Sequence, residues 1–112
     1  MAEITVQSLT TAGLTATYTA ASSGLSDEFV NNGHTLIVVK NSVAATNSAV
    51  VTSRVSPVPT GLVAVNVTVE VSASGERMSG FFDQAAYNDS SGKTAITWST
   101  HTGITIAAIS VT

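Results

Sequence analysis

Apolar and polar residues alternate along most of the chain, and few stretches show helical spacing. Val, Ile and Thr dominate the alternating stretches, and both properties are typical of β-strands. Residues 4–7 alternate before a turn at Thr10 to Gly13, and residues 14–19 alternate again. These two segments predict a hairpin close to the start of the chain.

The next segment, residues 20–33, breaks this alternation. It contains two glycines, paired serines and paired asparagines, so it predicts a long connection with a short helical turn at Asp27 to Val30. Asn32-Gly33 is a strong turn signal. The following stretch, His34 to Lys40, is nearly continuously apolar in its middle, which predicts a central strand covered on both faces.

Two prolines divide the second half of the chain. Residues 49–55 predict a strand after a polar loop, and Pro57 to Gly61 ends it because neither proline can donate to a sheet ladder. The clearest strand pattern follows at residues 63–72, with a valine at every second position. A shorter strand is predicted at 76–82, and residues 93–99 and 104–109 alternate again.

About eight strands with almost no helix predict a single all-β domain over residues 1–112. Strands with one buried and one wet face indicate a two-sheet antiparallel β-sandwich, and the long connections favour a jelly-roll-like order. Residues 1–11 are expected to be either the first strand or an arm that reaches a neighbouring molecule.

Charged residues make up only 10% of the chain, against about 25% in typical proteins. A surface this poor in charge predicts that part of it is hidden against other subunits, with a polar-surfaced monomer as the alternative. The net charge of −3 and four scattered Lys and Arg residues argue against nucleic acid as a partner. No segment has the length of a membrane span or the pattern of a classical signal, so we expect a soluble protein without a membrane partner.

The residues that could carry chemistry form no catalytic pattern. The chain has no cysteine, and its two histidines, His34 and His101, stand outside known metal spacings. Both are expected at exposed loop ends, and a hydrolase would require them to converge. Asp27 and Glu28 are adjacent and are expected in a solvated loop. We therefore expect no catalytic residue, no cofactor, no bound metal and no enzymatic activity.

Four residues with oxygen-bearing side chains precede the strand at 93–99. They are Asp83, Asn88, Asp89 and Ser90. Calcium takes ligands of this kind, but the spacing does not match an EF-hand loop. Capping of turns by these side chains is the favoured interpretation.

Most of the large aromatic residues lie in the last third of the chain: Phe81, Phe82, Tyr87 and Trp98. Such a group is expected to anchor the core or a subunit contact. The alternative is a sugar-binding platform made by Tyr87 and Trp98.

One set of short motifs in this last third resembles a known family. Glu76-Arg77-Met78-Ser79-Gly80-Phe81-Phe82 is followed by Tyr87-Asn88-Asp89, by Gly92-Lys93 and by a strand ending at Trp98-Ser99. The set resembles small head decoration, or capsid cement, proteins of tailed bacteriophages, in which G-E-R-x-x-G-P-F precedes Y-N-D-x-x-G-K. Phe81 stands where that pattern often carries proline. The resemblance covers roughly the last forty residues, with a weaker echo at Asn31 to His34.

The resemblance implies a structural virion protein that is not an enzyme. Such proteins are β-sandwich or jelly-roll subunits, commonly homotrimers, which bind the major capsid protein on the outside of the shell and stabilise the mature head. It further implies synthesis in the bacterial host cytoplasm and a place on the capsid surface. The residues expected at a subunit or capsid interface are Ile4, Val6, Phe81, Phe82, Tyr87 and Trp98. The alternative function is a receptor- or carbohydrate-binding module of a phage tail or a secreted protein.

Overall fold

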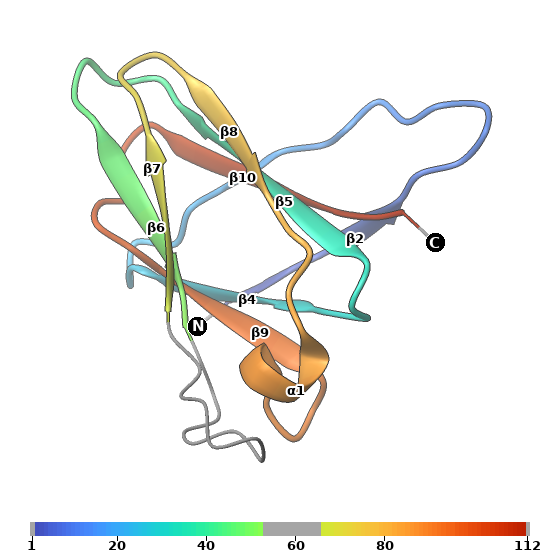
Figure 1. Ribbon diagram of the computed structural model, residues 1–112. Helices are drawn as coiled ribbons and strands as arrows, with labels where there is room; N and C mark the ends of the chain where they lie inside the picture. Colours follow the sequence, from blue (N-terminus) through green and yellow to red (C-terminus); the bar gives the residue numbers. More distant parts are fainter. Residues whose placement is uncertain (1, 53–65, 112) are drawn as a thin grey trace.

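Two five-stranded β-sheets pack against each other, and one short helix lies beside them (Figure 1). The structure, a computed structural model, describes residues 2–52 and 66–111. The first sheet consists, in spatial order, of β1 (Ala2–Ile4), β4 (Ser26–Val30), β9 (Lys93–Trp98), β6 (Asn47–Val51) and β7 (Val67–Val71). The second consists of β2 (Val6–Ser8), β10 (Ile104–Ser110), β5 (Thr35–Asn41) and β8 (Glu76–Ser79), with β3 (Thr19–Ala20) paired to β10. The helix is α1 (Gln84–Tyr87).

The mostly-β, two-sheet architecture confirms the main prediction from the residue pattern. Strand β5 is covered on both faces as expected, since Ile37, Val38 and Val39 are all buried. The sheet order does not show a jelly-roll. Several expected features, namely Ser53 to Val55, the proline breaker at Pro57 to Gly61 and the strand start at Val63 to Val65, lie outside the described residues. Within the described ranges, no helix is long and apolar enough to cross a membrane.

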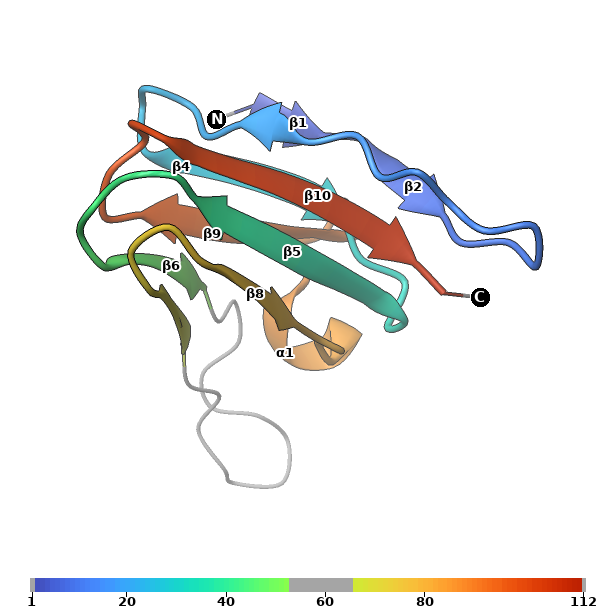
Figure 2. The same cartoon turned by 90° about the horizontal axis from the view of Figure 1, so that it is seen from above.

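The prediction that the sheets are purely antiparallel was wrong, because the first strand pairs in parallel with both of them. The segment breaks at Thr5, so that β1 lies parallel to β4 in one sheet and β2 lies parallel to β10 in the other. Ile4 points into the core, while Glu3 forms an ion pair of 2.6 Å with Lys93. The hydrogen bond and the charge of Glu3 raise the pKa of Lys93 above its ordinary value. Residues 2–8 thus join the two sheets along one side of the sandwich, as Figure 2 shows from above.

The hairpin expected between residues 4–7 and 14–19 does not form. The backbone of β2 is already paired with β10, so the returning chain bonds to a side chain instead. The Gln7 side-chain amide donates to the Thr17 carbonyl at 2.7 Å and accepts from the Thr17 amide at 2.8 Å. Of the second segment only Thr19 joins a strand, β3, and the turn between the two segments projects away from the sandwich (Figure 1).

The short helical turn expected at Asp27 to Val30 is wrong, because these residues form strand β4. Phe29 and Asp27 both point inward, and only 2% of Asp27 is exposed, so this carboxylate does not lie in a solvated loop. Its Oδ2 accepts from the Trp98 indole Nε1 at 2.8 Å and from the Ser22 amide at 3.0 Å, and its Oδ1 accepts from the Ser22 hydroxyl. These donors replace water around the buried charge, which makes its burial possible.

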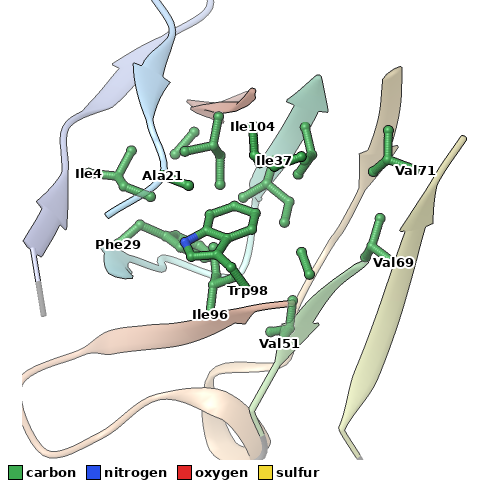
Figure 3. Packing of buried hydrophobic residues seen from close by; sticks show 14 of the residues in the cluster. Ile4, Ala21, Phe29, Ile37, Val51, Val69, Val71, Ile96, Trp98 and Ile104 are labelled. Carbon is green, nitrogen blue, oxygen red and sulfur yellow. The ribbon is translucent and has the colours of Figure 1, made fainter. Parts of the chain in front are cut away.

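The hydrophobic core fills the space between the two sheets (Figure 3). Its largest fully buried side chains come from the centres of the long strands, with Phe29 from β4, Ile37 from β5, Ile96 from β9 and Ile106 from β10. Trp98 lies among them and is only 3% exposed. Residues at every second position along each strand share this layer, which is the reason the alternating pattern predicted the strands.

Gly103, in the turn before β10, is required by close packing. Its φ is +72°, and a Cβ at this position would lie 2.6 Å from Val43 Cγ1 and 2.9 Å from Ser42 Oγ. We expect Gly103→Ala to lower the free energy of unfolding by about 1–3 kcal/mol, because of the strained backbone and the clash. Urea unfolding followed by circular dichroism measures this. Gly24→Ala is the control, since nothing lies within 4 Å of its added Cβ, and an equal loss in both variants would contradict the packing argument.

Candidate assembly surface

Two consecutive phenylalanines after β8 point to opposite sides of the second sheet. Phe82 is 3% exposed and packs in the core, with ring centroids 6.0 Å from Phe29 and 5.9 Å from Tyr87. Phe81 is 53% exposed, and its ring meets that of His34 edge-on at 5.6 Å. The Gly80–Phe81 peptide bond is cis. One phenylalanine therefore holds the chain to the core and the other is presented to solvent.

Phe81 borders a shallow hollow at the edge of the second sheet. The hollow has a volume of about 180 Å³ and is lined by Leu36, Met78, Ser79, Gly80 and Phe81. Met78 is 67% exposed, the most of any large hydrophobic residue that the structure describes. A Cβ on Gly80 would lie 2.9 Å from Leu36 Cβ, so this glycine lets the backbone lie directly against β5. We call these five residues, together with His34, the β8 surface.

The residues next to the β8 surface on β5 and β10 are also apolar, but they are mostly covered. The register places Met78 beside Val38, and Val38 beside Ala107. The neighbouring row pairs Leu36 with Ile109. Val38 and Ala107 are buried, and Leu36 and Ile109 are partly buried. The exposed apolar area is therefore centred on Met78 and Phe81, and an exposed apolar patch can mark an interaction site.

Charge appears at the other end of the same face. Lys40 and Glu76 lie opposite each other in the register of β5 and β8, but the Lys40 ammonium lies 4.1 Å from the centre of the Tyr18 ring. An open groove of about 740 Å³ runs beside them, and His101 and Thr105 belong to its lining. The face is thus divided into an apolar half around Met78 and a polar half around Lys40.

The two histidines do not come together. His34 precedes β5 and its carbonyl accepts from the Val111 amide, whereas His101 lies in the turn before β10. Because β5 and β10 are antiparallel, the histidines lie at opposite ends of this strand pair. Both are exposed as expected, and the convergence that a hydrolase would need is not present.

Two of the four oxygen-bearing side chains before β9, Asp83 and Asp89, cap turns as expected, whereas the Asn88 side chain bonds to Asn31 and Thr94. Asp83 Oδ1 accepts from the Ala85 amide at 3.0 Å and caps α1. Asp89 Oδ1 accepts from the amides of Ser91 at 2.8 Å and Lys93 at 3.1 Å. Across residues 2–52 and 66–111, no group of three His, Asp or Glu side chains is placed to hold a metal ion.

The predicted interface residues are divided between the core and the surface. Ile4, Phe82 and Trp98 are buried, and Val6 and Tyr87 are partly buried against the core cluster. Phe81 alone among the six is exposed. Trp98 is therefore not presented as a sugar platform. Met78 and Leu36 were not singled out from the sequence, and the signal that could have indicated them is the exposed side of β8 next to Gly80.

Comparison of the chain with known proteins identified no relative. The chain matches no family model, no curated protein and no solved structure at a significant level.

Proposed function

We propose that this chain is a structural virion protein that binds the outside of a bacteriophage capsid and stabilises the mature head. The observation that carries the proposal is the exposure of Met78 and Phe81 within the segment that resembles capsid cement proteins. The exposed apolar side chains of the β8 surface are suited to a permanent protein contact, since obligate interfaces are rich in apolar area.

The mechanism is burial of apolar surface, repeated around the shell. Each subunit that binds the mature lattice, and not the precursor, stabilises the mature state by mass action. The low share of charged residues, 10%, supports a surface that is partly covered in the assembled particle. In this proposal the subunits act as homotrimers, and the partner is the major capsid protein. The chain is made in the bacterial host cytoplasm and has no catalytic role. In the same proposal its strands are connected in a jelly-roll-like order.

Binding to shells tests the proposal. Purified protein is mixed with capsids that lack their decoration protein, taken from the phage whose genome encodes this chain, and the mixture is sedimented. We expect saturable co-sedimentation and a higher temperature of shell disruption when the sites are filled. Serum albumin serves as the control for trapping in the pellet. No co-sedimentation at saturating concentration would contradict the proposed function.

A further inference from the structure

The outer edge of β8 has backbone groups without a partner in the described part of the chain. The Asn41 amide donates to the Gly75 carbonyl at 2.8 Å, and this pair continues the register of β5 with β8. Residues of an antiparallel strand alternate between those that bond to the neighbouring strand and those that point away. Arg77 and Ser79 therefore face β5, and the N–H and C=O groups of Glu76 and Met78 point to the open edge.

Side chains around this edge define what could pair with it. Met78 and the hollow beside Phe81 offer an apolar site next to the free backbone groups. Glu76 is exposed and has no ion pair among the described residues, because the facing Lys40 lies over Tyr18. The Arg77 guanidinium donates to the Glu70 carbonyl at 3.0 Å and so links β8 to the edge of the other sheet. This contact joins β8 to the other sheet, and it does not use the outward N–H and C=O groups of Glu76 and Met78.

We propose that β8 binds an extended segment of the partner protein as an additional strand of the second sheet. Main-chain hydrogen bonds to Glu76 and Met78 would provide affinity, as in other cases of strand addition. An apolar side chain of the added strand fills the hollow, and a basic side chain two residues away faces Glu76. This proposal rests on the proposed function: the strand that pairs with β8 belongs to the capsid protein.

A pair of substitutions at one position separates backbone from side-chain effects. Met78→Ala and Met78→Pro both remove the thioether, but only proline removes the N–H at the open edge. Proline is tolerated at such a position because the N–H does not bond to β5. Circular dichroism and the emission of the buried Trp98 verify that each variant is folded. We expect Met78→Pro to bind undecorated capsids at least about tenfold more weakly than Met78→Ala.

Amide hydrogen exchange of the wild-type protein provides a second measurement that does not depend on a variant. The amides of Glu76 and Met78 are expected to exchange rapidly in the free protein and to become protected on the shell. Amides that still exchange rapidly on the shell would overturn strand addition. The charge is tested by Glu76→Gln, which we expect to weaken binding several-fold at low salt and little at high salt. Unchanged binding at low salt would contradict the claim that a basic side chain of the added strand faces Glu76.

The outcomes distinguish the inference from the proposed function. Equal weakening by Met78→Pro and Met78→Ala would overturn strand addition and leave capsid binding through side chains intact. Wild-type affinity in both variants would overturn strand addition and remove the β8 surface as the contact. A homo-oligomer that dissociates in Met78→Pro alone, measured by sedimentation velocity, would show that the added strand comes from a second copy and would overturn the capsid strand as occupant.

Discussion

Trp98→Ala is expected to lower the free energy of unfolding by about 3–5 kcal/mol through lost packing alone. The indole is 3% exposed in the centre of the core and donates its Nε1–H to buried Asp27 at 2.8 Å. Removing it also takes one donor from a buried carboxylate, which adds about 1–3 kcal/mol. Since small domains are stable by about 5–15 kcal/mol, the variant should be largely unfolded in moderate urea.

Trp98→Phe separates the two contributions. It keeps most of the ring packing, removes the hydrogen bond and leaves a small cavity, so we expect a smaller loss, nearer to about 1–3 kcal/mol. Thr97→Ala, on the exposed side of β9, is the control and should change stability by less than about 0.5 kcal/mol. Urea unfolding followed by circular dichroism measures all three variants. A loss below about 1 kcal/mol for Trp98→Ala would show that the indole is not held in the core.

Phe81→Ala and Phe82→Ala are expected to affect different properties, although the two residues are adjacent. The first should weaken capsid binding, and the second should lower the stability of the fold. Phe82 packs against Phe29 and Tyr87 in the core, so its loss should cost about 3–5 kcal/mol of stability. Phe81 is exposed, so its loss should cost less than about 1 kcal/mol. If Phe81 anchors the capsid contact, its removal should weaken binding by about 30-fold or more, as for an aromatic hot spot.

Each variant serves as the control for the other. Thermal unfolding measures stability, and co-sedimentation with undecorated capsids, at a temperature where both variants are folded, measures binding. Wild-type binding by Phe81→Ala would remove this residue from the contact. A large loss of stability in Phe81→Ala would contradict the exposed placement of its ring.

The alternation of apolar and polar residues predicted the strands whose buried face can be read from the local sequence. Successive side chains of a strand point to opposite faces of the sheet. The alternation in β9 and β10 and the apolar centre of β5 could therefore be recognised without knowing the partner strands. Strand β4 was not predicted because its inward Asp27 interrupts the apolar pattern. Its partner Trp98 lies 71 residues away, so the interaction that allows its burial has no local signal.

The candidate surface was only partly predictable for a similar reason. The aromatic residues between 81 and 98 were recognised as anchors, but which of Phe81 and Phe82 points outward depends on how the chain leaves β8 beside Leu36. The parallel pairing of β1 and β2 was also not predictable, because the break at Thr5 is set by two partner strands, β4 and β10. Both features depend on contacts between distant segments.

Peroxide oxidation of Met78 tests the central claim most directly. Met78 is 67% exposed in the free subunit, so its thioether should oxidise readily, and mass spectrometry of the peptide that contains it gives the rate. The account predicts that Met78 becomes strongly protected when the protein is bound to capsids, while free protein at the same concentration is oxidised. Equal oxidation rates in the bound and free protein would contradict the assignment of the β8 surface as the capsid contact.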